Sequence, residues 1–594
     1  MKNERGASLV LVLLISLIFI TLGLSILSVS LGGTKRTTIR ENDVITSQDA
    51  IVEMTKVLSD FRKEVNNVSL KKRSDLTNGI YQTELQQIID GLPIKLSERY
   101  KDRSTTKPML LVSDETSNYL TDASYKTKYY TRVLLFKIDY YGKYNSSTPE
   151  LKKSISRRLY LSPTPSFLQY AVGAKNNLNL NGASDLVGNI YGSNINILNQ
   201  ANYMDALTPS HSESHADTPY PYIRGSLVID NALQLLKRNQ PQGVTYGSLK
   251  LPLLTQGMVS EYFYQNKVPI IKKPDENFVN MDFKQTLYDK LDLILPTKMN
   301  ENDPLDLSIG DKIVDGIFQD AKFDPTQESV LGLNAASTSH QYVIEKDTNP
   351  SDITLKIPAG KKVVLMTDLP DAQGNSIHSD SPFIIKDHLN LEEDQWLIVD
   401  GDLEIYNRIN GNENPINIQG NIVVLGNVSI HGFDNDTAEE KDKIQFNTAM
   451  YVLGNSSIYS TNITGLDGKQ LVLLSKGDLL VNRTNEFSRV DENVVPLKAF
   501  LYTDGEATLY GVGSAISING GIFANHNLTI NSIRQNIVTT RGPNALDIDS
   551  ESMQNNQASR FSVIYDKTIL SNQLESLPTV DSLRIIMDHY TFSK

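Results

Sequence analysis

The chain has 594 residues, enough for several domains or for one elongated architecture with additions. It contains no cysteine, which excludes disulfides, thiolate zinc sites and thiol nucleophiles. The formal net charge of -12 argues against a general nucleic-acid binder, because phosphate binding needs a basic face. We therefore expect no nucleic acid among its partners.

The N-terminus carries one long apolar run. No charged residue occurs from Ala7 to Thr34, and a helix of that length exceeds the ~30 Å of a bilayer core. A secretory signal peptide has an apolar segment of only about 7–15 residues before its cleavage site. Ser28-Val29-Ser30 has the small residues of such a cleavage site, but the apolar run before it is too long for a signal peptide. Basic residues flank the run on both sides, so charge gives no orientation.

A helical pattern continues beyond the apolar run. Apolar residues recur at spacings of three and four, which places them on one stripe of a helix: Ile51, Met54, Leu58, Phe61, Val65 and Val68. No proline interrupts residues 7–68, so one continuous helix is expected. The alternative is an anchor helix and a separate packed helix, with a break at Gly32-Gly33.

Residues 125–162 hold two β-prone runs around a connection rich in Gly, Ser and Pro. This arrangement predicts an antiparallel hairpin. Because it follows a long amphipathic helix, we expect a small α/β subdomain in which the strands cover the helix stripe.

A repeat dominates the C-terminal half. The segments VDGDLEI, VLGNVSI, VLGNSSI, SKGDLLV, TDGEATL and ANHNLTI centre on Gly401, Gly426, Gly454, Gly477, Gly505 and His526. The next position is always polar and forms a predicted turn column: Asp402, Asn427, Asn455, Asp478, Glu506 and Asn527. The fourth position after the centre is always apolar: Ile405, Ile430, Ile458, Val481, Leu509 and Ile530. Alternation after such a turn is typical of a short strand with one buried face.

A repeat unit of roughly 20 to 30 residues cannot bury its inward face alone, so neighbouring units must stack. We expect a mainly β chain: a long N-terminal transmembrane α-helix, a small α/β subdomain, and a right-handed parallel β-helix with an insertion. An antiparallel sandwich is the alternative. Weaker copies occur around Gly173, Gly192 and Gly225, whereas residues 231–395 show no repeat and read as an insertion of unknown role.

Candidate chemistry is sparse. Many β-helical proteins act on polysaccharide, but the solenoid acids lie beside turn glycines, where Asp is favoured structurally: Asp400, Asp402, Asp478 and Asp504. Lys476 beside Asp478 is too little to indicate a lyase. His211, Glu213 and His215 are close enough in sequence to share a metal, but without a further firm ligand we expect a solvated loop. The acidic stretches 300–312 and 433–443 lack the residue spacing of calcium-binding loops. We expect no catalytic residue, metal or cofactor.

The residues Lys2-Asn-Glu-Arg5-Gly6 directly before ASLVLVLL resemble a prepilin leader of the type IV pilin superfamily. The resemblance implies cleavage by a prepilin peptidase after Gly6 and a new, N-methylated N-terminus at Ala7. Most pilins have glutamate at the fifth mature position, which here is Leu11. In this the chain resembles PilX-type minor pilins and the K-type minor pseudopilin. The resemblance to PilX N-terminal-domain proteins extends to four later segments: PSFLQYAVGAKNNLNLNG, WLIVDGDLEIYN, INIQGNIVVLGNVSIHG and FSVIYDKTIL.

The sequence thus predicts a single-pass surface protein with most of the chain outside the cell, joining a pilus or related filament for adhesion or assembly priming. Expected partners are the membrane, the peptidase, other pilin-like subunits, and a glycan or other surface ligand. The alternative is an uncut single-pass protein with a carbohydrate-binding or polysaccharide-active β-helix. The expected segments are a leader at 1–6, the helix at 7–68, the subdomain at 69–165, solenoid at 166–230 and 396–534, the insertion at 231–395 and a C-terminal segment at 535–594.

Overall fold

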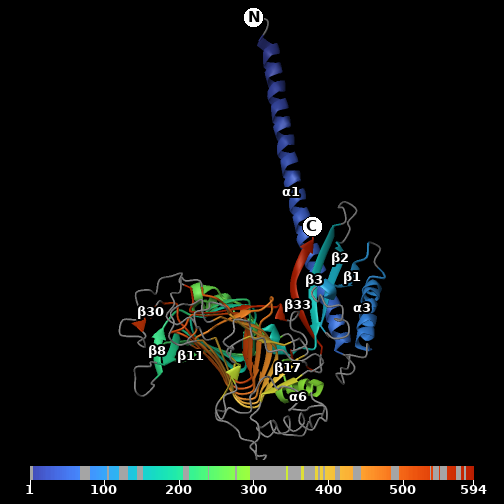
Figure 1. Cartoon of the computed structure of the whole chain (residues 1–594). Coiled ribbons are helices and arrows are strands. Elements are labelled where there is room, and N and C mark those ends of the chain that lie inside the picture. Colours follow the sequence, from blue (N-terminus) through green and yellow to red (C-terminus); the bar gives the residue numbers. More distant parts are fainter. Residues whose placement is uncertain are drawn as a thin grey trace, which may run out of the picture. The chain divides into compact units, whose positions relative to one another are not determined.

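The chain forms two compact units, Met1–Pro163 with Asp581–Lys594, and Thr164–Val580. Figure 1 shows the computed structural model. It describes residues 4–66, 80–102, 106–118, 131–142, 151–204, 213–238, 240–274, 277–294, 343–344, 363–366, 382–385, 388–391, 395–407, 415–432, 443–482, 484, 494–535, 537–538, 547–548, 558–569, 577–578, 580 and 583–593.

The first unit begins with one long helix, α1 (Glu4–Val65), which runs through Gly32 and Gly33 without a break. The continuous helix expected from the sequence is therefore confirmed as far as Val65, and the alternative of two separate helices is wrong; Val68 lies outside the described residues. At ~1.5 Å per residue its 62 residues span roughly 93 Å.

The sheet of this unit has the strand order β1-β2-β3-β33 and is antiparallel throughout. The predicted hairpin is confirmed, because β2 and β3 pair along their length, with Ile138 opposite Ile155. The fourth strand comes from the C-terminus and pairs with β3. The strands are β1 (Met109–Asp114), β2 (Arg132–Tyr141), β3 (Lys152–Ser162) and β33 (Arg584–Ser593).

The helix stripe packs on this sheet as expected. Met54, Leu58, Phe61 and Val65 are buried in one cluster with residues of β2 and β3. The rings of Phe61 and Phe136 have centroids 5.1 Å apart. The C-terminal half of α1 is thus held by the hydrophobic core of the first unit.

Helix α3 (Ile80–Arg99) is joined to α1 through a buried carboxylate. Glu53 is only 2% exposed and forms an ion pair with the Arg99 guanidinium, which also pairs with Asp60. The Tyr100 hydroxyl donates to the other oxygen of Glu53 at 2.8 Å. Because a buried charge is costly without partners, these contacts fix α3 against α1.

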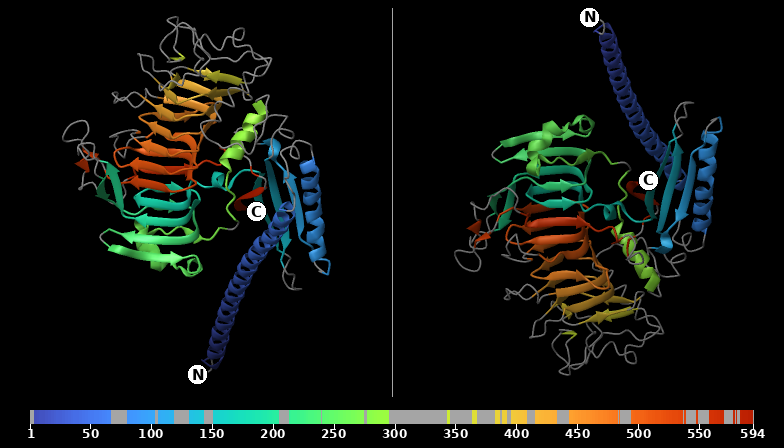
Figure 2. Two further views of the ribbon diagram at one scale, coloured as in Figure 1. Left: turned by 90° about the horizontal axis from the view of Figure 1, so that it is seen from below. Right: turned by 90° about the horizontal axis from the view of Figure 1, so that it is seen from above.

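The second unit is a parallel β-helix built on one large curled sheet (Figure 2). Among the described residues, the pairings of this large sheet are parallel apart from that of β11 (Gln240–Gly247) with β10, so the antiparallel sandwich is wrong. The strands stack in three columns, which we name faces A, B and C. Face A precedes the turn residues, face B follows them, and face C closes each coil.

Face A contains β14 (Val363–Met366), β17 (Trp396–Val399), the ends of β19 (Ile416–Val424) and β21 (Lys443–Val452), β24 (Leu471–Ser475), β26 (Leu497–Thr503), the end of β28 (Ile516–Ala524), the starts of β4 (Val172–Gly182), β6 (Ile190–Leu198) and β10 (Ser226–Lys237), and β12 (Ile270–Lys272).

Face B contains β13 (Val343–Ile344), β15 (Phe383–Ile385), β18 (Leu403–Tyr406), β20 (Val428–His431), β22 (Ser456–Tyr459), β25 (Leu479–Asn482), β27 (Ala507–Gly511), β29 (Leu528–Ser532) and the ends of β4, β6 and β10. Face C contains β16 (Leu389–Asn390), the starts of β19, β21, β26 and β28, β23 (Asn462–Gly465), β32 (Phe561–Tyr565), β5 (Asp185–Val187) and β9 (Tyr222–Arg224).

Short elements lie beside the coils. Two small hairpins pair β7 (Gln200–Met204) with β8 (Glu213–Asp217) and β30 (Ile537–Val538) with β31 (Asp547–Ile548). The described part of this unit also contains the α-helices α5 (Gln256–Val259) and α6 (Phe283–Ile294).

The spatial order of the coils differs from their order in the sequence. The end of β28 pairs with the start of β4, and β29 pairs with the end of β4. The chain therefore enters the solenoid in its middle and builds β4, β6, β10 and β12 in one direction. It then returns at the opposite end and builds from β14 and β15 back to β4 (Figure 2).

This path differs from the insertion expected at residues 231–395. Both ends of that segment belong to the solenoid: most of β10 and all of β12 lie near its start, and β13 to β16 lie near its end. The segment therefore connects opposite ends of one β-helix.

A buried ion pair lies where the two parts of the solenoid meet. Arg534, which follows β29, pairs with Asp185 of β5, and its guanidinium lies 3.9 Å from the ring centre of Tyr264. Burial raises the pKa of Asp185, and the nearby Arg534 and Arg224 offset only part of that effect. The seam is therefore specified by polar as well as apolar contacts.

The seam can be tested by cross-linking, since the chain has no cysteine of its own. Asn179 and Thr529 are partners across the seam although they are 350 residues apart in sequence. Neighbouring strands lie about 4.8 Å apart, within the Cα range of a disulfide. We expect Asn179→Cys with Thr529→Cys to form a disulfide on mild oxidation, seen as a mobility shift on a non-reducing gel.

The matched control pairs Asn179→Cys with Thr508→Cys, whose residue lies one coil beyond Thr529. At roughly 10 Å its Cα is out of disulfide range. Equal cross-linking of both pairs would contradict the coil order described above.

Candidate functional site

The N-terminal half of α1 exposes its apolar side chains. The large ones from Leu9 to Leu31 are exposed, including Leu11 at 59%. Within the described part of the chain, α1 is the helix long and apolar enough to cross a bilayer. Gly6 and Ala7 lie in its first turns. Cleavage after Gly6 and the role of Leu11 stay predictions.

Two hydroxyl groups within this apolar segment donate to carbonyl groups of the same helix. Thr21 donates to the Ile18 carbonyl at 2.9 Å, and Ser25 donates to the Thr21 carbonyl at 2.8 Å. Such bonds let Ser and Thr sit in an apolar environment without an unpaired polar group. The segment is therefore chemically suited to lipid or to contact with other apolar helices.

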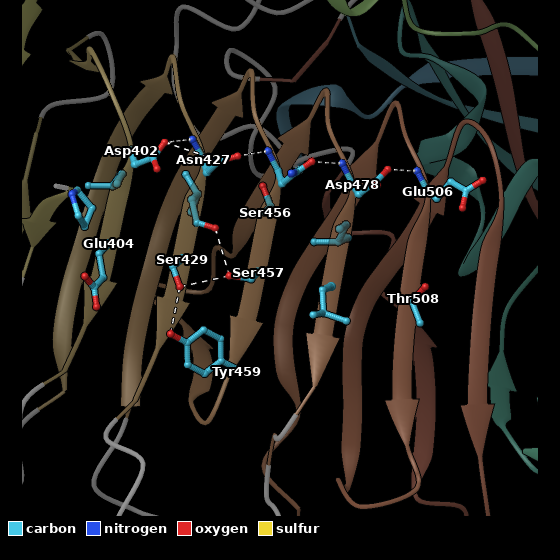
Figure 3. A pocket seen from close by; sticks show the side chains of 16 residues that line it. Asp402, Glu404, Asn427, Ser429, Ser456, Ser457, Tyr459, Asp478, Glu506 and Thr508 are labelled. Carbon is cyan, nitrogen blue, oxygen red and sulfur yellow. Dashed lines mark hydrogen bonds between the residues drawn. The ribbon is translucent and has the colours of Figure 1, made fainter. Parts of the chain in front are cut away.

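In the second unit, the turn column forms a ladder of hydrogen bonds from coil to coil (Figure 3). Each side-chain Oδ1 accepts the backbone N–H of the next column residue. The distances are 2.7 Å from Asn427 N to Asp402, 2.8 Å from Asn455 N to Asn427, 2.8 Å from Asp478 N to Asn455 and 2.8 Å from Glu506 N to Asp478. Asp and Asn fit here equally because both supply the acceptor oxygen.

The ladder continues across the seam through side-chain amides. Asn527 donates to Glu506 at 2.7 Å, Asn177 to Asn527 at 2.8 Å, Asn194 to Asn177 at 3.1 Å and Asn231 to Asn194 at 2.7 Å. Local sequence patterns did not identify these last three members. The weak copies of the repeat were centred on Gly173 and Gly192, but Gly173 pairs with Phe523, which lies three residues before the repeat centre at His526.

The column glycines are required by close stacking. A Cβ on Gly454 would lie 2.6 Å from Asn427 Oδ1 and 2.6 Å from the Gly426 carbonyl oxygen. Gly426 and Gly477 face the preceding coil at similar distances. Among these turns only Gly401 has a positive φ, of 144°. The glycines therefore let successive turns approach closely enough for the ladder to form.

Faces A and B are exposed to different degrees. Strands of face A are buried on both sides, as in β17 and β24, and rings such as Phe167 and Phe278 pack on the outer side of that face against Tyr502 and Phe523. Strands of face B alternate between buried and partly exposed residues, as in β18, β20 and β22. Face B is therefore the side where the described strands offer outward side chains to a ligand.

A shallow groove of about 660 Å³ lies on face B (Figure 3). One rim is the turn column from Asp402 to Glu506. The outward residues of successive strands form the floor: Glu404, Ser429, Ser457, Leu480 and Thr508. Ser457 donates to Ser429 at 3.2 Å, so neighbouring coils are linked along the floor.

An aromatic stack is formed by the last residues of β18, β20 and β22, on the side of the groove away from the turn column. The His431 ring lies between Tyr406 and Tyr459, with centroid distances of 5.2 and 4.7 Å. His431 Nε2 lies 2.5 Å from Glu404 Oε1. The Tyr459 hydroxyl accepts from Ser429 at 3.4 Å. These contacts hold Glu404 and Tyr459 in place beside the floor.

The acids considered for catalysis are engaged in structural contacts. Asp402 and Asp478 belong to the ladder, and Asp504 accepts a hydrogen bond from Asn525 at 2.8 Å and lies 3.5 Å from Lys476 Nζ. Asp400 also has an interaction partner. Their environment is that of turn residues, as the sequence analysis expected.

The other candidates do not come together as a metal site in the described residues. Glu213 and His215 lie on β8, where His215 Nδ1 is 2.9 Å from Asn202 Oδ1. His211, the stretch 300–312 and nearly all of 433–443 lie outside the described residues.

Comparison with known proteins gives little. No family model matches the chain, and no curated protein matches it. Among solved structures, it is similar to the competence-associated pilin ComZ from Thermus thermophilus, at 13% identity over 88% of this chain and 98% of that chain. The TM-score of 0.25 is too low to establish a common fold.

The glycine column yields a stability prediction. We expect Gly454→Ala to lower the free energy of unfolding by about 1–3 kcal/mol, because the new Cβ would overlap atoms of the preceding turn. Thermal unfolding of the detergent-solubilised chain measures this. Gly257→Ala is the control, since a Cβ there meets nothing within 4 Å. Equal melting temperatures for both variants would rule out close stacking as the reason for glycine.

Proposed function

We propose that this protein is a pilin-like surface subunit that inserts in the membrane and joins a type IV pilus or related filament. The observation that carries the proposal is the division of α1: its C-terminal half is buried in a folded unit, whereas the uncharged segment from Leu9 to Leu31 exposes its large apolar side chains. Such a surface needs a bilayer or a bundle of similar helices around it.

The leader-like residues Lys2 to Gly6 support a filament subunit over a permanent anchor, because they directly precede the apolar helix as in prepilins. In this proposal a prepilin peptidase cuts after Gly6, and the helix starting at Ala7 passes from the membrane into the filament core. The mechanism is packing between apolar helices, with the solenoid displayed outside the cell for adhesion or assembly priming. No enzymatic role is proposed.

Leu11 bears on the place of the subunit in a filament. A carboxylate at that depth would need a cationic partner, such as the terminal amine of a neighbouring subunit, to offset the cost of its burial. Leucine avoids this cost where no neighbour presents an amine. The proposal is therefore a minor subunit, placed at the tip, rather than a bulk-forming one.

Cleavage is tested by mass analysis of the mature N-terminus from host membranes. We expect a chain that begins at methylated Ala7, and a Gly6→Val variant that retains the leader. A wild-type chain that begins at Met1 would contradict the proposed pilin-like function and favour the uncut single-pass alternative.

The tip position is tested with Leu11→Glu. We expect no increase in the protein's share of sheared filaments, measured by quantitative immunoblot against the major subunit, because the new carboxylate finds no amine. Leu9→Glu, at an exposed position of the same helix, is the control. A large gain with Leu11→Glu alone would show that a neighbouring amine is present and that the tip position is wrong.

A further inference from the structure

We propose that the groove on face B binds a linear polysaccharide that carries free amino groups. The groove crosses five coils, from the turn at Asp402 to that at Glu506, so its long direction follows the stack of strands. Successive coils are about 4.8 Å apart, which is close to the advance of one pyranose unit in an extended chain. A repeating ligand can therefore make a similar contact at each coil.

The floor has the mixed chemistry that a sugar chain requires. Hydroxyls of Ser429, Ser457 and Thr508 can both donate and accept hydrogen bonds with sugar hydroxyls. Leu480 interrupts this row as an apolar residue that is 37% exposed, although it lies on a largely polar surface. Its side chain offers a contact for the C–H face of a sugar ring, and the Tyr459 ring stands at the border.

The charge of the groove is one-sided. Its described lining includes Asp402, Glu404, Asp478 and Glu506 but no Lys or Arg. Glu404 pairs with His431. For Asp402, Asp478 and Glu506 one carboxylate oxygen accepts from the next coil, whereas the second has no partner among the described residues. Three carboxylate oxygens along one rim favour a cationic ligand and disfavour uronic acids and nucleic acids.

A basic peptide is the main alternative cation, and the geometry favours the sugar. An extended peptide typically binds by adding its backbone to an unpaired strand edge, but the strands under this groove are paired on both sides. They offer only side chains. The inference does not depend on cleavage at Gly6 or on filament assembly, so its failure would leave the proposed function untouched.

The test is isothermal titration of the full chain in detergent with glucosamine oligosaccharides. N-acetylglucosamine and galacturonate oligosaccharides of the same length serve as neutral and acidic comparisons. We expect the amino sugar to bind most tightly, with an affinity that falls as salt is raised.

The charge-removing variant is Asp402→Asn, Asp478→Asn and Glu506→Gln combined. It keeps every acceptor of the ladder, since Asn already serves at positions 427, 455 and 527, and should lower the affinity roughly tenfold. Asn455→Asp adds a rim charge and should strengthen binding. Leu480→Ala should weaken binding of both the amino and the N-acetylated sugar.

The matched control removes three carboxylates outside the groove, Glu261→Gln, Asp467→Asn and Asp566→Asn. It removes the same number of negative charges and should leave the affinity within about twofold, since charges outside the groove are screened by salt. Three outcomes would overturn the proposal. The control variant could lose as much affinity as the charge-removing variant, or glucosamine and galacturonate oligosaccharides could bind equally well. A lysine-rich peptide could also bind as tightly as the amino sugar and lose affinity in the same variants.

Discussion

The second unit depends on one constraint: each coil within the stack must pair with its neighbours at a spacing close enough for the turns to bond. The ladder from Asp402 to Asn231 sets the register of that stacking, and the glycines beside it remove the Cβ atoms that would keep the turns apart. Because an inward-facing residue such as Ile430 is buried only by its neighbours, register and core formation are coupled.

Pairing in space does not require continuity in sequence, and the chain uses this freedom. Entry at β4 leaves an unpaired coil edge, which the returning chain covers with β28, β29 and β32. The ends of the stack lie instead at β12 and near β13 and β14. The first unit shows the same economy on a smaller scale, since β33 arrives from the far end of the chain to pair with β3.

The sequence was sufficient where a local pattern decided the structure. The continuous helix, the hairpin and the six-member turn column followed from periodicity and turn chemistry, because those signals depend on neighbours in sequence. The seam could not be predicted in the same way: Asn177 pairs with Asn527 through a contact 350 residues apart, and no local pattern encodes it. The difference in burial between faces A and B could also have been predicted from the sequence. The run LVLL at 471–474 before a turn is apolar throughout, as two-sided burial requires, whereas a strand after a turn, such as LEIY at 403–406, alternates.

The ladder also clarifies what the charges on the rim mean. Asn and Asp serve the turn equally well, as the bonds to Asn455 and Asp478 show with the same distance of 2.8 Å. The fold therefore fixes an acceptor oxygen at each coil but leaves its charge open. Where two carboxylates follow each other in the column, as at Asp478 and Glu506, they repel each other in a way that an amide would avoid. In the proposed groove the second oxygens of these carboxylates are the groups that a cationic ligand would meet.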